Sequence, residues 1–412
     1  MVNEILKTDI PDDWDIKKLE PNVGFVRSGK RLPKGYYVTP IPTQHPYIRV
    51  ADMRPGYVDV EGLMYVPDEA YFWIQKYRIY RDDIYISVAG TLGIVGQIPG
   101  YLDGANLTEN ANRITDIKCN IKFLMYWLMS SKIQGLINQT QTLGAQPKLA
   151  LTRIRNFPII LPPIEEQRQI AEVLCNVDTL ITNLRKLIRK KKDIRQGTMQ
   201  MLVTGEKRLG NFSGEWFDCT LDSIAYVLNG DRGINYPSGD DFIEYGIPFI
   251  NAGNISNNIV DVSTVDYISI EKYNSLGGVK IQKNDIIFCL RGSLGKCAIS
   301  NFTGGAPASS LCVIRAKDGI DARFLFHIIN SEITSRQIDN LNAGSSQPNL
   351  SAKSLKSFKF IIPKDVAEQE MISNILSDMD LDIYKLEEKL SKYQKIKLGM
   401  MDELLTGKVR LV

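Results

Sequence analysis

The chain has 412 residues, of which 44% are hydrophobic and 24% are charged, a composition typical of a globular protein with two to four domains. Its formal net charge is only +3, and that balance alone does not indicate nucleic acid as a partner. No stretch approaches about 18 consecutive apolar residues, so we expect no membrane span. The N-terminus lacks the basic-then-apolar order of a signal peptide, which favours a cytoplasmic location.

Residues 1–160 are predicted to form a first mixed domain of the α+β class. Short runs of β-branched and aromatic residues near turns predict strands, and a longer apolar run predicts a buried helix. We expect a twisted, largely antiparallel sheet with helices. The predicted strands are 47–50, 79–80, 84–88 and 157–161, and the predicted helix covers 123–129.

Residues 161–209 are predicted to form a long helix. Pro162 and Pro163 suit its first turn, and Gly205 suits its C-terminal end. A helix of about 40 residues would be about 60 Å long at 1.5 Å per residue. Its apolar residues recur at alternating steps of four and three, which is typical of a coiled-coil seam, and the pattern weakens at Lys191 and Arg195. The seam comprises Ile170, Leu174, Val177, Ile181, Leu184 and Ile188.

The second half of the chain repeats this plan, with a domain at 210–362 and a helix at 363–412. Gln167 and Gln369 are 202 positions apart, and the same offset separates many other matched residues. Such a repeat indicates a tandem duplication. The matches include Trp14 with Trp216, Asp83 with Asp285, Gly90 with Gly292 and Thr204 with Thr406.

The second long helix carries an equivalent seam, which weakens at Lys397. Because the first helix must leave one domain and reach the next, the second must run back for the two seams to meet. An antiparallel coiled coil is therefore expected; two unrelated helices, each packed on its own domain, would not explain the shared register. The second seam comprises Ile372, Leu376, Met379, Ile383, Leu386, Leu390 and Tyr393.

The sequence contains no recognisable catalytic or metal-binding motif. None of the six cysteines forms a C-x-x-C pair, and we expect reduced, mostly buried thiols. His327 lies in an apolar run and is expected in the core, whereas His45 lies in a loop. Phosphate-binding glycine loops and the Asn/Asp-Pro-Pro-Tyr tetrapeptide of amino-methyltransferases do not occur. These observations favour a binding role over an enzymatic one.

The two halves differ most in one loop near the start of each domain. The first half carries four basic residues there, and the second half has an unrelated sequence at 231–236. A shared scaffold with divergent loops suggests two recognition domains of the same kind, each of which binds a different target. A solvated run of charges is the alternative interpretation. The basic residues are Arg27, Lys30, Arg31 and Lys34.

Two further pairs of loops are candidates for contact with DNA. The glycine-rich loops could bring a hydroxyl or a cation close to phosphate or a base edge, although a plain β-turn would also require their glycines. The second pair carries Gln and Asn, which can read adenine or can equally cap the following turn. The first pair contributes Thr91, Arg291, Ser293 and Lys296, and the second contributes Gln146, Lys148, Gln347 and Asn349.

Together with the duplication, two short motifs resemble a known family over essentially the whole chain. The first helix opens with Leu161-Pro-Pro-Ile-Glu-Glu-Gln167, and both helices end in Leu-x-Thr-Gly, at Gly205 and Gly407. This pattern is similar to the specificity subunit of type I restriction-modification systems. The second copy departs from it with a single proline, Pro363.

The resemblance implies a non-catalytic, prokaryotic subunit that binds double-stranded DNA. Each target recognition domain would read one half of a bipartite sequence, and the helix pair would set the spacing of the half-sites. Two modification subunits, which bind S-adenosylmethionine and methylate adenine N6, would dock on the helices. Restriction subunits that use ATP and Mg would join them, so no cofactor is expected in this chain.

Two other functions are compatible with the residues alone. A duplicated coiled-coil scaffold that binds proteins would not require modification and restriction genes nearby. A methyltransferase with an unrecognised site would bind S-adenosylmethionine as an isolated chain.

Overall fold

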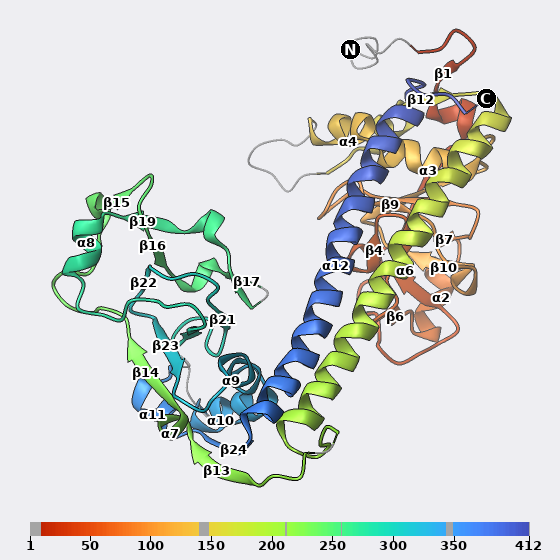
Figure 1. Ribbon diagram of the computed structural model, residues 1–412. Coiled ribbons are helices and arrows are strands. Elements are labelled where there is room, and N and C mark those ends of the chain that lie inside the picture. The colour runs from red at the N-terminus through yellow and green to blue at the C-terminus, as the bar shows by residue number, and fades with distance from the viewer. Residues whose placement is uncertain (1–9, 140–147, 211, 257, 343–348, 412) are drawn as a thin grey trace. The chain divides into compact units, whose positions relative to one another are not determined.

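The computed structural model describes residues 10–139, 148–210, 212–256, 258–342 and 349–411 (Figure 1). The chain forms two compact units. The first unit comprises Met1–Arg185 and Glu388–Val412, and the second comprises Lys186–Glu387. Each unit therefore combines one mixed domain with parts of both long helices. The boundaries expected at residues 161, 210 and 363 stay predictions.

The domain of the first unit contains two four-stranded sheets among its described residues. One sheet is antiparallel throughout, and the other includes a parallel pair, β3 with β10. The first has the order β2 (Phe25–Ser28), β11 (Ala111–Thr115), β8 (Ile84–Ser87) and β9 (Val95–Gly96). The second has the order β6 (Met64–Tyr65), β3 (Pro46–Ile48), β10 (Ala105–Leu107) and β7 (Arg78–Ile79).

Short strands and helices complete this domain. β1 (Asp15–Lys18) pairs with the closing strand β12 (Pro158–Leu161), and β4 (Met53–Arg54) pairs with β5 (Tyr57–Val58). The helices are α2 (Asp68–Ile74), α3 (Ile121–Met129), α4 (Ser131–Asn138) and α5 (Leu151–Arg155).

The domain of the second unit repeats the strand order of the first sheet; in the second sheet three strands correspond, and the fourth lies at the opposite edge. Its first sheet has the order β14 (Ala225–Asn229), β23 (Leu311–Ala316), β20 (Ile286–Cys289) and β21 (Cys297–Ile299). Its second has the order β15 (Phe242–Ile243), β19 (Asp266–Ile268), β16 (Ile247–Ile250) and β22 (Ala306–Pro307). The remaining pairs are β13 (Trp216–Thr220) with β24 (Lys359–Pro363) and β17 (Ile255–Ser256) with β18 (Ile259–Val260). The helices are α7 (Leu221–Ile224), α8 (Ile270–Ser275), α9 (Ala322–Ile329), α10 (Glu332–Asn342) and α11 (Ala352–Lys356).

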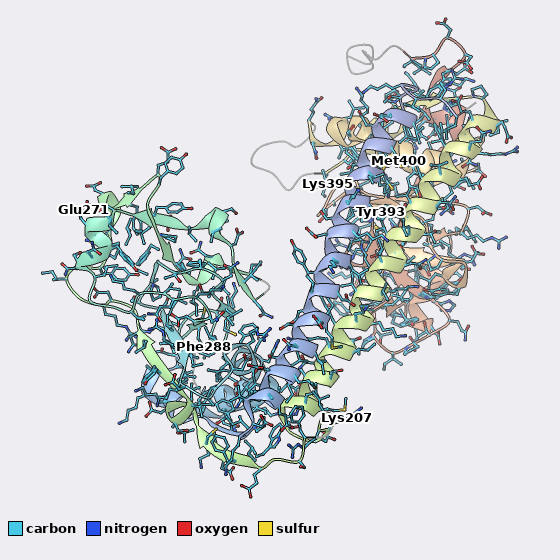
Figure 2. All side chains as sticks on the ribbon, viewed as in Figure 1. Lys207, Glu271, Phe288, Tyr393, Lys395 and Met400 are labelled. Atoms are coloured by element: carbon cyan, nitrogen blue, oxygen red, sulfur yellow. The ribbon has the colours of Figure 1, made fainter. Side chains whose placement is uncertain are left out.

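One sheet was predicted for each domain, and the structure has two because the central strand is buried on both faces. In β20, Ile286 and Phe288 face one hydrophobic core, whereas Ile287 and Cys289 face another. Alternate residues of a strand point to opposite faces, so a continuous apolar run must be covered on both sides. Phe288 lies fully buried among the side chains of this domain (Figure 2).

The two long helices are α6 (Ile164–Val203) and α12 (Val366–Leu404), with 40 and 39 residues. Pro162 and Pro163 precede the first helical residue instead of lying in the first turn. Gly205 and Gly407 follow the helices with φ of 71° and 76°. Glycine adopts this left-handed conformation without steric cost, so both residues suit the helix ends. No helix among the described residues combines the length and apolar character needed to span a membrane.

The two helices pair in antiparallel orientation within each unit. In the first unit, Asp178 pairs with Lys397 at 2.6 Å. In the second, Arg195 pairs with Asp380 at 2.8 Å and Lys192 pairs with Glu387 at 2.7 Å. Each ion pair joins residues whose numbers sum to nearly the same value, as antiparallel pairing in one register requires. The predicted antiparallel coiled coil is confirmed.

The predicted seam residues lie between the helices or against the domain cores. Ile170 and Leu174 belong to one core with Met401 and Leu404, as expected for facing positions of two antiparallel helices. Eight seam residues are buried: Ile170, Leu174, Ile181, Leu184, Ile188, Ile372, Leu376 and Ile383. The other five are half-buried: Val177, Met379, Leu386, Leu390 and Tyr393.

The interruptions of the seam are sites of ion pairing. Arg195 occupies a seam position and is buried, and its guanidinium makes two hydrogen bonds to Asp380, at 2.8 and 2.9 Å. Lys397 lies 202 positions further on and pairs with Asp178, which matches Asp380 at the same offset. Polar residues at seam positions help to specify the register of a coiled coil.

The Glu-Gln motif at each helix start joins three chain segments. In the first unit, Glu166 accepts hydrogen bonds from Trp14 and Arg410, at 3.1 and 2.6 Å. Gln167 accepts from the backbone N–H of Asn120, just before α3, at 2.9 Å. A buried carboxylate is costly without such partners, so the motif has a structural role.

The second unit repeats most of this arrangement. Glu368 pairs with Arg208 at 2.6 Å, and Gln369 accepts from the backbone N–H of Asp321 at 2.9 Å. The indole N–H of Trp216, unlike that of Trp14, makes no hydrogen bond with the described residues.

Candidate nucleic-acid interface

In the first unit, a short turn at residues 108–110 brings the predicted loops together. Glu109 in this turn pairs with Arg31 of the basic loop at 2.5 Å. The carbonyl of Asn110 accepts a hydrogen bond from Val88 N at 2.8 Å, at the start of the glycine-rich loop. Val88 in turn accepts from Leu149 N at 2.9 Å, next to Lys148. Three loops far apart in sequence therefore form one surface.

The second unit assembles the same surface from equivalent segments. Ser309 N donates to the hydroxyl of Tyr236 at 3.4 Å, and Leu290 N donates to the carbonyl of Ser310 at 2.9 Å. Leu350 N donates to the carbonyl of Leu290 at 3.0 Å. The loop at 231–236, the loop at 291–296 and the segment at 349–350 are thus adjacent. We call these two surfaces the loop surfaces.

The divergent loops leave their strands at equivalent glycines. A Cβ on Gly29 would lie 2.0 Å from the carbonyl oxygen of Thr108, and one on Gly230 would lie 2.4 Å from that of Pro307. Neither position can hold a side chain without displacing the backbone. The backbone geometry therefore fixes where each loop begins.

The basic residues of the first unit occupy different environments. Lys30 lies 5.7 Å from the ring centroid of Tyr77, and Arg31 is paired with Glu109. Lys34 is exposed in the same loop, which lines a hollow of about 390 Å³. Arg27 lies on β2 with its guanidinium 5.2 Å from the ring centroid of Phe25, so it points back along the strand. The structure therefore groups Lys30, Arg31 and Lys34, and leaves Arg27 apart.

The other predicted residues lie on the two loop surfaces. Thr91 and Lys148 are exposed in the first unit, where Ala89 and Lys148 form a β-bridge. Arg291 and Asn349 form the matching bridge in the second unit. In the second unit, Arg291, Ser293 and Asn349 are exposed, whereas the Lys296 side chain donates a hydrogen bond to the carbonyl of Ala252 at 3.2 Å. Gln146 and Gln347 lie outside the described residues.

The geometry of the glycine-rich loops accounts for their glycines. Gly90 and Gly93 have φ of 76° and 75°, and Gly292 and Gly295 have φ of 75° and 83°. A β-turn with left-handed residues requires glycine at such positions. The turn does not require a cation at Arg291 or a hydroxyl at Ser293, so the plain-turn interpretation leaves those side chains unexplained.

Three exposed apolar side chains on the loop surfaces escaped the sequence analysis. Tyr36 and Tyr37 follow Lys34, and Ile234 lies in the loop of the second unit. Their exposed fractions are 40%, 82% and 100%. Apolar residues in an aperiodic loop give no signal that distinguishes contact with a ligand from burial in a core. Ile234 has no apolar residue next to it in the sequence, and only the structure shows that its side chain projects into solvent.

The structure offers little support for catalysis by side chains. Among the described residues, no group of three or more His, Cys, Asp and Glu side chains could hold a metal ion. Burial raises the pKa of Cys297 to about 12, so this thiol is protonated at neutral pH. Cys289 and Cys312 are buried in the same domain.

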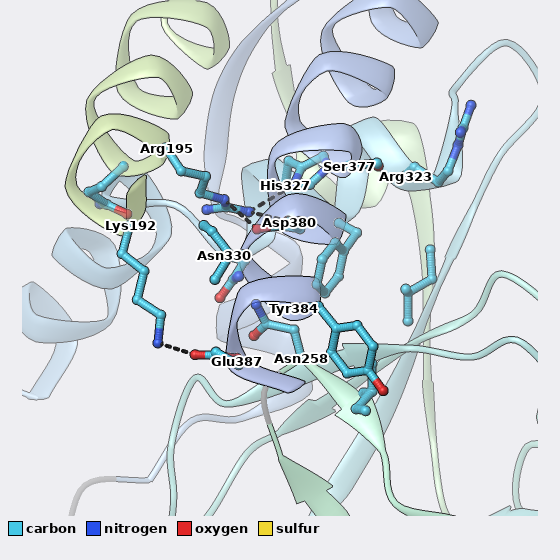
Figure 3. Close-up of a pocket in the computed structure, with 15 residues that line it drawn as sticks. Lys192, Arg195, Asn258, Arg323, His327, Asn330, Ser377, Asp380, Tyr384 and Glu387 are labelled. Atoms are coloured by element: carbon cyan, nitrogen blue, oxygen red, sulfur yellow. Dashed lines mark hydrogen bonds and ion pairs between the residues drawn. The ribbon is translucent and has the colours of Figure 1, made fainter. Parts of the chain in front are cut away.

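The second unit also contains a cavity of about 540 Å³ between its helices and its domain (Figure 3). Four of its charged groups form two ion pairs: Arg195 binds Asp380, and Lys192 binds Glu387 at 2.7 Å. Arg323 also lines the cavity and lies 3.9 Å from Asp321. His327 lies 3.3 Å from Arg195, and burial, reinforced by the charge of Arg195, lowers its pKa to about 3. The histidine is therefore neutral at physiological pH.

A family model for the type I restriction modification DNA specificity domain matches this chain twice, at residues 11–192 and 214–397. The chain therefore belongs to the type I restriction-modification specificity family. It is a non-catalytic subunit whose duplicated domains recognise DNA sequence.

Three comparisons place the chain among its relatives. The putative type I restriction enzyme MjaX specificity subunit of Methanocaldococcus jannaschii is 26% identical over 440 aligned positions, covering 98% of this chain and 95% of the relative. The crystal structure of the type I system S subunit from M. genitalium matches with a TM-score of 0.60 and 18% identity, covering 97% of both chains. A chain from a study of complex assembly and conformational transition of the type I R-M system matches with a TM-score of 0.55 and 15% identity, covering 98% of this chain and 100% of the other.

Proposed function

We propose that each unit reads one half of a bipartite DNA target through its loop surface. One observation carries this proposal: the same three-segment surface occurs twice on the same backbone frame, with different side chains in the two copies. The first copy offers Lys30, Lys34 and Lys148, and the second offers Arg291 and Asn349. Arginine reads guanine and asparagine reads adenine in the major groove. Two different half-sites are therefore expected.

The helix pair would act as the spacer between the half-sites. Half-sites read from one side of a duplex are separated by about one helical turn, roughly 34–36 Å. Helices of 40 and 39 residues are, at 1.5 Å per residue, about 60 Å long. The ion pairs at Asp178 and Asp380 would hold their register, so the length of the helices would determine the gap in the target.

Modification subunits would dock on an exposed apolar stripe of α6. Leu187, Ile194 and Met201 recur every seven residues and are all exposed, although they border the buried seam. Leu187 and Ile194 also line a groove between α6 and α12 with Met379. An apolar stripe at heptad spacing is the surface that a further helix covers in a bundle. The related chain from a study of type I assembly supports partner subunits of this kind.

In this assembly, the cofactors would belong to the partners. S-adenosylmethionine would be bound by the modification subunits, and ATP and Mg by the restriction subunits. The described residues of this chain supply DNA-facing loops and a helical spacer.

Methylation mapping tests the proposed function directly. The chain is co-expressed with its cognate modification subunit, and the host DNA is sequenced for N6-methyladenine. We expect a split motif that disappears when this chain is omitted. An active methyltransferase whose motif does not depend on this chain would refute the proposal and favour the scaffold function.

Arg291→Ala should relax recognition at one position of one half-site. Arg291 is exposed beside Asn349, and loss of one bidentate contact to guanine costs about 1–3 kcal/mol of discrimination. Methylation mapping of the variant complex measures this loss. Lys359→Ala, in an exposed residue of β24, is the control. Unchanged discrimination at both half-sites would indicate that the loop has a purely structural role.

Leu187→Glu combined with Ile194→Glu should prevent stable association with the modification subunit. The two charges would have to be buried without partners beneath the docked helix, which is unfavourable. Co-purification of the two subunits measures the effect. Lys186→Glu, at an adjacent exposed position on α6, makes the same net change of charge and is the control. Normal co-purification of the stripe variant would place the docking surface elsewhere.

A further inference from the structure

Ile234 is the most exposed large apolar side chain of the second unit, with an exposed fraction of 100%. It lies at the tip of the loop at 231–236, between Arg232 and Tyr236. A single exposed aliphatic residue needs no explanation in an ordinary loop. This loop differs because the residues around the tip are held in place.

Four hydrogen bonds fix the loop on both sides of Ile234. Asp231 accepts from the backbone N–H groups of Gly233 and Gly277, at 2.6 and 2.7 Å. These bonds hold the pKa of the Asp231 carboxyl below its usual value. Asn235 donates to the carbonyl of Ser275 at 2.9 Å. The fourth is the bond from Ser309 to Tyr236 described above. The tip is thus pre-organised, and the entropy cost of ordering it on binding is reduced.

The same loop is part of the loop surface of the second unit. Tyr236 is joined to the turn at 308–310, and that turn is joined to Leu290 beside Arg291. Tyr236 also packs edge-to-face on Phe249, with ring centroids 5.6 Å apart. An apolar tip and an exposed arginine are therefore presented by neighbouring segments of one surface.

The first unit presents an apolar side chain from the corresponding loop. Tyr37 has an exposed fraction of 82% and follows the cation Lys34, whereas Ile234 follows the cation Arg232. Counted from Gly29 and Gly230, both loops have an arginine at the second position, Arg31 and Arg232, and both combine a cation with an exposed apolar group. This pattern suits a major groove, where phosphates line the edges and the thymine methyl is the apolar group of the base pairs.

We propose that Ile234 contacts the 5-methyl group of a thymine in the half-site read by the second unit. This inference rests on the proposed function, because it names one base contact of the same surface. A branched aliphatic side chain recognises a methyl group by excluding water, whereas cytosine, which lacks the methyl, offers an amino group to the groove. Ile234 would therefore favour an A·T pair at one position.

Uracil substitution isolates the contact, because uracil differs from thymine only in lacking the methyl group. Binding of the complex with its modification subunits is measured on duplexes carrying the mapped target. Each thymine of the half-site is replaced by uracil in turn. For the wild type, one replacement should weaken binding about fourfold, as for one buried carbon. For Ile234→Ala, the same replacement should have no effect.

Two further variants complete the experiment. Ile234→Val retains a branched contact and should still discriminate thymine from uracil. Ile259→Ala removes another exposed isoleucine of the same unit and should behave like the wild type. If no single uracil weakens wild-type binding, or if Ile234→Ala remains equally sensitive, the inference is wrong. In that case the wild type would still bind its target specifically. The proposed function would therefore remain supported although the thymine contact of Ile234 is refuted.

Discussion

Replacement of Asp380 by alanine should destabilise the second unit by about 2–3 kcal/mol. The change leaves the guanidinium of Arg195, whose side chain is only 9% exposed, without its carboxylate partner. Breaking a fully buried ion pair costs about 3–5 kcal/mol. Asp380 is 40% exposed, so water can reach the site and the cost should be smaller. Urea unfolding, followed by hydrogen exchange in α9 and α12, measures the effect.

Two controls distinguish an orphaned charge from lost packing. Asp382→Ala removes an exposed aspartate from the same helix, which pairs with Lys191 at 2.9 Å, and should change stability little. Arg195→Leu combined with Asp380→Leu removes both charges and should recover most of the stability, because no buried charge is then left without a partner. A double variant as unstable as Asp380→Ala would show that packing, and not charge, dominates the site.

Acidification from pH 8 to pH 5 should lower the stability of the second unit by about 2 kcal/mol through His327 alone. Burial, and then the nearby charge of Arg195, lower the pKa of His327 to about 3 in the folded protein. The unfolded value is about 6.5. Protons therefore bind more readily to the unfolded state. The stability contribution is fully present above pH 6.5 and is lost as the pH falls towards 3.

His327→Gln provides the comparison, because glutamine does not titrate in this range. Its unfolding free energy should change less between pH 8 and pH 5 than that of the wild type, with hydrogen exchange in α9 as the local reporter. The first unit has Tyr126 in the corresponding place, where its hydroxyl donates to Asp178 at 2.7 Å. An equal pH dependence in both proteins would mean that His327 is not the group responsible.

Much of the fold could be predicted from the sequence because it rests on periodicity. The steps of four and three on both helices identified the seam, and the repeated offset identified the duplication. Strand β8, for example, was predicted from a β-branched run that the structure buries. In each case, the signal is a regular pattern that one element carries by itself.

The loop surfaces could not be predicted in the same way. They depend on the turns at 108–110 and 308–310, which join loops separated by many residues. Some of the links are backbone hydrogen bonds that any sequence could make, and others are single side-chain contacts of Glu109 and Tyr236. The charged residues in the seam were also hard to interpret. Lys191, Arg195 and Lys397 appeared only to interrupt the apolar repeat, although Arg195 and Lys397 form the ion pairs of the helix core. A charged residue at a position expected to be apolar can either interrupt the seam or form an ion pair, and the sequence does not identify its partner on the other helix.

The assignment of Met401, Leu404 and Leu405 to the core of the first unit has a consequence for synthesis. The second unit is one continuous stretch, Lys186–Glu387, whereas the first needs Glu388–Val412 to be complete. The ribosome therefore makes most of the first domain before the second, and adds Met401, Leu404, Leu405 and Arg410 only after the second is made. The domain that emerges first is therefore completed only after the second has been made, and a chain terminated between Glu388 and Met401 would leave the first domain incomplete while sparing the second.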